Sequence, residues 1–197
     1  MILARFRCSA TTSFGQVSSN CQNNGHTAAL DPSGGPVRSG PMRFLCDEML
    51  APLARLLRAA GYDTYLASDG EPDAGLLKIA REEGRILLTR DKRLAAAAAE
   101  SVLIEGRGVD AEAESLSRGV VLDWGFAPFT RCVVDNARLR EASLDEIDRM
   151  PESAQAKAGP FRACPACGRL YWPGSHVRRI GERLNGLTNG APMPPQA

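Results

Sequence analysis

Four carboxylates in the first half of the chain have the types and spacing needed to bind a metal ion. Asp47 and Glu48 directly follow one short apolar run, and Asp91 follows another. Asp73 stands near the start of a predicted helix. Because functional sites of open α/β sheets form at the carboxyl ends of the strands, we expect these side chains to lie together. Mg²⁺ or Mn²⁺, which prefer oxygen ligands, would relieve their mutual repulsion, activate water and stabilise charge on a phosphate.

The same residues can instead serve as helix caps, and the residue types and spacing do not decide between metal binding and capping. An acidic residue after a strand often caps the next helix, and Asp73 beside Pro72 suits that role. Cys46 is a buried strand residue by its pattern, with a nucleophile as the alternative. His176 has no acidic partner nearby in the sequence, so no arrangement for nucleophilic catalysis is as well supported as the metal site.

The elements that must position these carboxylates alternate between strands and helices. In the first helix, leucines recur at helical spacing, while Arg55 and Arg58 fall on the other side. Such alternation predicts an α/β fold with a parallel sheet covered on both faces. Strands are predicted at 42–46, 63–67, 85–90 and 101–104, and helices at 48–60, 72–84, 92–100, 110–118, 144–149 and 175–187.

A second kind of metal site is predicted near the C-terminus. Cys164-Pro-Ala-Cys167-Gly168 is a knuckle of the kind that binds Zn²⁺, because its tight turn lets two thiolates reach one ion. The chain has six cysteines, and no secretory signal is recognisable, so a metal is favoured over a disulfide. The alternative is a labile disulfide, with Cys132 as a small buried residue.

Basic and aromatic residues follow this knuckle. Between residues 161 and 187, five arginines stand against one acid, Glu182. Arginines contact phosphates, and aromatic faces stack on unpaired bases, which favours RNA as a partner. Tyr171 and Trp172 have an alternative role, which is to pack the small module. The RNA-binding residues expected here are Arg169, Tyr171, Trp172, Arg178 and Arg179.

Several segments together resemble a known family. MRFLCDEMLAPLARLLRAAGYDT, then DAGLLKIAREEGRILLTRD, and the later RC-x-x-x-N, C-x-x-C and YWPGSH elements resemble the Mut-7-C ribonuclease family, a bacterial branch related to PIN-domain nucleases. The resemblance covers about residues 42–187. It implies a PIN-like three-layer α/β/α fold with a C-terminal zinc-ribbon-like module. It also implies hydrolysis of RNA phosphodiester bonds with Mg²⁺ or Mn²⁺.

The resemblance further implies roles for single residues. Asp47 and Asp91 are expected to be the main metal ligands, and Asp73 the third. Glu48 is expected to bind metal or to orient water. Arg90, in LLTRD, is expected to contact phosphate, with an exposed surface arginine as the alternative.

Two neighbouring features also follow from the resemblance. Thr89 is expected to hydrogen-bond a carboxylate. Relatives carry a first C-x-x-C before an Asn, but here the segment is RCVVDN, with Asp135 in place of the second cysteine. Three outcomes stay open: Asp135 completes a zinc site with Cys132, Cys164 and Cys167, His176 supplies the fourth ligand, or the site is weakened or lost.

The organisation of the chain follows from its composition. Residues 1–41 are rich in Ser, Asn, Gly, Thr and Pro, which predicts a disordered extension, with Met42 as a possible translation start. A nuclease domain is expected over 42–125, a cysteine-rich module over 126–187 and a disordered tail over 188–197. Cys21 and His26 form a further, weaker metal-binding possibility.

The remaining expectations concern partners and location. The net charge of +1 does not indicate any class of binding partner. The many Ala, Arg and Gly residues suggest a bacterial protein. No stretch reaches the roughly 20 apolar residues of a membrane span, so a cytoplasmic protein is expected. An antitoxin partner or a homo-oligomer stays open. The rival function is a non-catalytic RNA-binding or adaptor protein, against which the retained aspartates argue.

Overall fold

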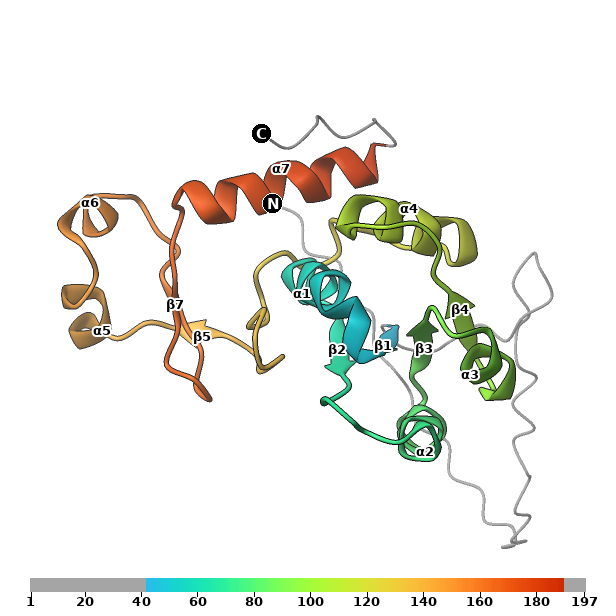
Figure 1. Cartoon of the computed structure of the whole chain (residues 1–197). Coiled ribbons are helices and arrows are strands. Elements are labelled where there is room, and N and C mark those ends of the chain that lie inside the picture. The colour runs from blue at the N-terminus through green and yellow to red at the C-terminus, as the bar shows by residue number, and fades with distance from the viewer. Residues whose placement is uncertain (1–41, 190–197) are drawn as a thin grey trace, which may run out of the picture. The chain divides into compact units, whose positions relative to one another are not determined.

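The computed structural model describes residues 42–189, all within one compact unit, Arg38–Ala197. The predicted disordered extension, Cys21, His26 and nearly all of the predicted tail lie outside the described residues. The described part is an α/β fold with a four-stranded parallel sheet, followed by a three-stranded antiparallel sheet (Figure 1). The predicted fold class is therefore confirmed.

The parallel sheet and its helices follow the predicted alternation. The strands, in the spatial order β2-β1-β3-β4, are β1 (Arg43–Cys46), β2 (Asp63–Leu66), β3 (Ile86–Thr89) and β4 (Ser101–Leu103). The helices between and after them are η1 (Glu48–Leu50), α1 (Ala51–Ala59), α2 (Asp73–Glu83), α3 (Lys92–Ala97) and α4 (Val109–Gly119). All pairs in this sheet are parallel, so the carboxyl ends of the strands share one edge.

Successive residues of each strand pack on opposite faces of the sheet. Phe44, Cys46 and Leu88 pack in one core with residues of α1, α4 and α7 (Ser175–Thr188). Leu45 and Leu87 pack in a second core with residues of α2 and α3. Because strand side chains alternate in direction, two buried faces require helices on both sides, which gives three layers.

The C-terminal module is built from short elements. Its sheet consists of β5 (Arg140–Glu141), β6 (Arg162–Ala163) and β7 (Leu170–Tyr171), and between β5 and β6 lie α5 (Leu144–Asp148) and α6 (Glu152–Gln155). The sequence predicts α5 but not α6, which is a single turn. The helix α7, with 14 residues, closes the described chain. None of the helices in residues 42–189 combines the length and apolar character needed to cross a membrane.

The structure corrects one expectation about α1. Arg58 was expected on the exposed side of this helix, but its exposed fraction is only 5%. Its Nε donates to the Thr64 carbonyl at 2.9 Å, and its Nη1 donates to the Val133 and Val134 carbonyls at 3.3 and 2.6 Å. Helical periodicity indicates only which face the helix buries against its own sheet. The C-terminal module covers the other side.

A substitution at Gly61 tests how closely the segment around Ala127, at the start of the C-terminal module, approaches the end of α1. Gly61 has a φ of +99°, and a Cβ added there would lie 2.2 Å from the Ala127 carbonyl oxygen. The Ala127 N–H donates to the Ala60 carbonyl at 3.0 Å, which holds the two segments together. We predict that Gly61→Ala lowers the free energy of unfolding by about 2–4 kcal/mol, from backbone strain and overpacking together.

Gly84 is the matched control, because it also has a positive φ, +61°, but its added Cβ would meet no atom within 4 Å. Gly84→Ala should therefore cost only the backbone strain, about 1–2 kcal/mol. Urea unfolding followed by circular dichroism measures both values. Equal losses in the two variants would contradict the proposed close contact.

Candidate active site and metal centre

Asp47 and Asp91 lie at the same edge of the parallel sheet. Asp47 follows β1 and Asp91 follows β3, and these strands are neighbours. The hydroxyl of the fully buried Thr89 donates to Asp47 Oδ2 at 2.9 Å and accepts the Asp91 N–H at 3.0 Å. The expected hydrogen bond from Thr89 to a carboxylate is thus confirmed. One hydroxyl links the two acidic positions.

Both aspartates also cap the helix that follows them. Asp47 Oδ1 accepts the Glu48 N–H at 2.7 Å. Asp91 Oδ1 accepts the N–H groups of Arg93 and Leu94 at 2.6 and 3.1 Å. Capping does not exclude metal binding, because an ionised carboxylate has about four acceptor sites. It fixes the direction in which each carboxylate points.

The other two carboxylates are exposed and less constrained. Asp73 is the first residue of α2, and the residue at the N-cap is Pro72, which makes no side-chain capping hydrogen bond. Glu48 Oε2 accepts the Gly70 N–H at 3.3 Å, which ties η1 to the loop before α2. Within residues 42–189, these four acids do not supply three oxygens that all lie within 4.8 Å of one another. The structure therefore links Asp47 and Asp91 through Thr89, but it does not bring Asp73 and Glu48 into one compact group of ligands with them.

Arg90 is anchored to the protein rather than extended into solvent. Its guanidinium donates to the Gly106 carbonyl, and its Nη1 lies 3.8 Å from Glu112 Oε1. Glu112 is only 4% exposed, and burial raises the pKa of its carboxyl group. Glu112 escaped the sequence reasoning, because its position within an amphipathic helix carries no signal of burial. Arg90 thus joins the end of β3 to α4.

The predicted zinc ligands lie together in the C-terminal module. One ligand atom from each of Cys132, Asp135, Cys164 and Cys167 lies within 4.8 Å of the others. Cys132 Sγ is 3.7 Å from Cys167 Sγ, and Cys164 Sγ is 3.2 and 3.3 Å from the Asp135 oxygens. Tetrahedral zinc with bonds of about 2.3 Å places two thiolates about 3.8 Å apart. These distances suit one zinc ion.

The two halves of this centre have the same backbone geometry. The Cys132 carbonyl accepts the Asn136 N–H, and the Cys164 carbonyl accepts the Gly168 N–H, each at 3.0 Å. Asn136 and Gly168 have φ values of 68° and 69°. Asp135 precedes Asn136 and therefore takes, in the first knuckle, the place that a cysteine takes in the second. Position and distance together favour it as the fourth ligand.

His176, Tyr171 and Trp172 do not belong to this group of four ligands. His176 is exposed on α7, and its ring nitrogens do not belong to the group of four ligand atoms. The hydroxyl of the buried Tyr171 donates to Cys132 Sγ at 3.1 Å and accepts the Val133 N–H at 3.1 Å. These contacts match the packing role of Tyr171 rather than base stacking. Trp172 is half-buried and lines a hollow of about 170 Å³.

Burial and hydrogen bonds act in opposite directions on the Cys132 thiol. Burial by itself raises the pKa of Cys132, but the Tyr171 hydroxyl and backbone N–H groups outweigh it, and the pKa lies below the usual thiol value. Cys46 differs, because complete burial raises its pKa, and it remains an uncharged thiol in the sheet core. Cys46 therefore has the environment of a structural residue rather than of a nucleophile.

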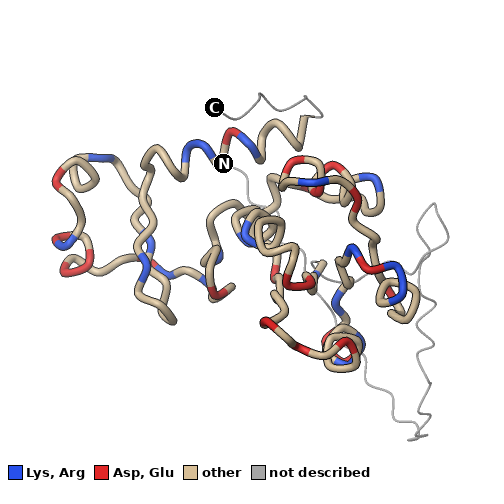
Figure 2. The backbone as a smooth tube through the Cα atoms, viewed as in Figure 1, with Lys and Arg blue, Asp and Glu red and all other residues tan. Residues whose placement is uncertain are grey.

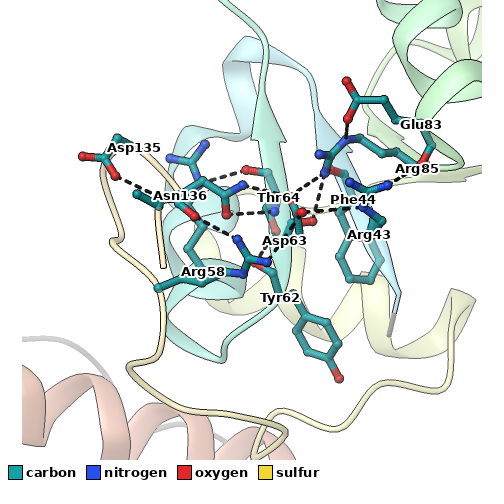
Figure 3. A network of polar contacts seen from close by, with 12 residues as sticks. Arg43, Phe44, Arg58, Tyr62, Asp63, Thr64, Glu83, Arg85, Asp135 and Asn136 are labelled. Atoms are coloured by element: carbon teal, nitrogen blue, oxygen red, sulfur yellow. Dashed lines mark hydrogen bonds and ion pairs between the residues drawn. The ribbon is translucent and has the colours of Figure 1, made fainter. Parts of the chain in front are cut away.

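A polar network joins the first knuckle to the parallel sheet (Figure 3). Asp63 Oδ1 accepts from Arg85 Nη1 and from Asn136 Nδ2, each at 2.8 Å. Asn136 Oδ1 in turn accepts the Thr64 N–H at 3.1 Å. Asp63 Oδ2 lies 3.5 Å from Arg131 Nη2. Sequence reasoning missed this network, because its members are far apart in the chain.

Comparisons with known proteins identify a related family. The profile of the Mut7-C RNAse domain matches residues 42–184. A human protein described as an exonuclease mut-7 homolog is 47% identical over 47 residues, which make up 24% of this chain and 5% of the human protein. The chain thus spans only a small part of that relative's length. No solved structure matches the chain.

Asp63 gives a prediction about pH. Burial by itself raises its pKa, but hydrogen bonds from Arg85 and Asn136 outweigh burial and lower the pKa of Asp63 to about 2. This stabilisation is present above the unfolded pKa of about 3.9 and is lost as pH falls towards 2. We predict that Asp63→Asn lowers the free energy of unfolding by about 2 kcal/mol at pH 6.

The difference between the parent and Asp63→Asn should shrink between pH 4 and pH 2, where the parent loses the same stabilisation. Urea unfolding at several pH values measures it. Asp145→Asn, at an exposed acid of α5, is the control and should leave the stability nearly unchanged. A difference that stays constant down to pH 2 would contradict the role of the Asp63 charge.

Proposed function

Because the chain belongs to the Mut7-C RNAse domain family, we propose that it is a PIN-like, metal-dependent ribonuclease that hydrolyses RNA phosphodiester bonds. The observation that carries the proposal is the pair Asp47 and Asp91, on neighbouring parallel strands and linked through Thr89. Carboxylates at this edge of an α/β sheet lie where such folds form their sites. The cofactor we propose is Mg²⁺ or Mn²⁺, which both prefer oxygen ligands.

The oxygen ligands that these residues offer are of the kind that a hard divalent cation prefers. Asp47 and Asp91 are the proposed main ligands, with Asp73 as third ligand and Glu48 as a ligand or a residue that orients water. A cation held there would activate water and offset the charge that builds on the scissile phosphate. Thr89 holds the Asp47 carboxylate in place, and the capping bonds from α3 hold that of Asp91.

A second metal, Zn²⁺, is proposed for the centre formed by Cys132, Asp135, Cys164 and Cys167. Three thiolates and one carboxylate close the site, which gives it a structural role. Zinc would tie together two segments that are distant in sequence and so contribute to the folding of the module. Arg169, Arg178 and Arg179 are proposed to contact RNA phosphates, since all three are exposed.

A second candidate function is a non-catalytic RNA-binding or adaptor protein. One observation favours it: the four acids at the sheet edge do not form a compact group of three ligands in the described residues. If the carboxylates serve only as helix caps, the fold would present RNA-binding residues without cleaving RNA. Cleavage assays separate the two functions.

We predict that Asp47→Asn and Asp91→Asn each reduce Mn²⁺-dependent cleavage of a labelled single-stranded RNA by at least about 100-fold, because each removes a charged ligand. Thr89→Val should reduce it by about 10–100-fold, through the orientation of Asp47. Glu82→Gln, the same kind of change at an exposed acid of α2, is the control. Undiminished cleavage by both aspartate variants would exclude the proposed site, and RNA binding without any cleavage by the parent would favour the adaptor function.

We predict that Asp135→Cys raises zinc affinity and that Asp135→Ala lowers it by about ten-fold or more, because the first restores a softer ligand and the second removes one. Zinc content by mass spectrometry and competition with a chelator measure both. His176→Ala and Asp145→Ala serve as controls and should bind zinc like the parent. An unchanged affinity in Asp135→Ala, with a loss in His176→Ala, would assign the fourth position to His176 instead.

A further inference from the structure

A cavity of about 470 Å³ lies between α1 and α7. Arg55 and Leu56 line it from α1, and His176, Ile180 and Arg183 line it from α7. The three residues of α7 are spaced by four and three positions, so they form one stripe along that helix. The volume falls within the range of about 300–1,000 Å³ that is typical of ligand sites.

The two remaining walls come from the metal centre and from α4. Val133 and Val134 belong to the first knuckle, and Arg169 directly follows Gly168 of the second. Val109, the first residue of α4, closes the cavity on another side. The nuclease fold and the metal module therefore build this cavity together.

The lining of the cavity is basic and apolar, without an acidic residue. Arg55, Arg169, Arg183 and His176 are its polar groups, and the rest of the wall is apolar. Arg183 also pairs with Asp110 at 3.1 Å, which leaves Arg55 and Arg169 as the exposed arginines. Basic residues on both α1 and α7 are visible in Figure 2. This combination suits a ligand that has anionic groups and flat apolar parts.

One end of the cavity lies towards the candidate active edge, because Pro52 and Val109 line it near the starts of α1 and α4. The helix α1 follows Asp47 and Glu48 through η1, and α4 follows the carboxyl end of β4. Both helices therefore begin at the carboxyl edge of the sheet, and both contribute walls to the cavity. A polymer held along α1 would therefore run from Val133 and Val134 towards the carboxylate edge.

We infer that this cavity binds a segment of single-stranded RNA beside the cleavage site, an inference that rests on the proposed ribonuclease function. The phosphates contact Arg55 and Arg169, and the bases pack on the aliphatic wall and on guanidinium planes. No Phe, Tyr or Trp and no acidic residue lines the cavity, so recognition depends on charge and on contact with apolar side chains and the His176 ring. The site therefore holds RNA with little preference for sequence.

The test is the affinity of the full chain for a fluorescent 12-nucleotide RNA of mixed sequence, measured by anisotropy in an Asp47→Asn background that keeps the RNA intact. The double variant Arg55→Glu, Arg169→Glu reverses one charge on each of two walls. We expect Kd to rise at least ten-fold. The slope of log Kd against log salt should fall by about 1.4, because each lost phosphate contact on a single strand contributes about 0.7.

The matched control is Lys78→Glu, Arg81→Glu, which makes the same change in net charge at two exposed positions of α2, on the other face of the sheet. Its Kd should stay within two-fold of the background value. Equal weakening in the two double variants, or none in the first, would overturn the proposed site. So would the absence of measurable RNA binding by the background protein.

Photocrosslinking keeps the inference testable if the double variant folds poorly. RNA that carries 4-thiouridine is crosslinked to the Asp47→Asn protein without further substitutions, and the modified peptides are identified by mass spectrometry. Crosslinks within residues 51–59 and 175–188 support the site, and crosslinks confined to other segments contradict it. Failure of the nuclease proposal would instead appear as absent cleavage by the parent, with binding and crosslinks retained.

Discussion

The buried guanidinium of Arg58 is the contact on which the arrangement of the C-terminal module depends. It donates to one carbonyl of β2 and to two carbonyls of the first knuckle. A charge with only 5% exposure is costly unless its hydrogen bonds are satisfied, so these carbonyls must stay where they are. The position of Val133 and Val134 relative to the sheet is therefore set by α1.

A second set of contacts holds the same knuckle from the other side. Asn136 adopts a left-handed conformation that closes the knuckle, and its side chain reaches both Asp63 and the Thr64 N–H. Glycine tolerates such a φ most easily, as Gly168 does in the second knuckle, but glycine has no side chain to make these bonds. The choice of Asn thus satisfies the turn and the docking together, and it places Asp135 beside the cysteines.

At the sheet edge, the same residues have structural and proposed chemical roles. The Asp47 carboxylate is held by the Glu48 N–H and the Thr89 hydroxyl, and the Asp91 carboxylate is held by two N–H groups of α3, so both are oriented before any ligand arrives. Preorganisation of this kind reduces the reorganisation that a metal site needs. Arg90 and the buried Glu112 connect this edge to α4, which also forms a wall of the basic cavity.

Strand and helix periods and the C-x-x-C spacing are local signals, so the sequence predicted the α/β class, the strands and helices around the parallel sheet, α5, α7 and the grouping of the cysteine ligands. The strands β5, β6 and β7 and the helix α6 were not predicted, because they are only two to four residues long. The early end of α3 at Ala97 was not predicted, since the chain must turn there for Ser101 to pair with Leu87. Only the tertiary structure shows that Arg58 is buried, which residues contact Asp63, and that a cavity lies between α1 and α7. Each of these features depends on segments more than 70 residues apart that meet only after folding.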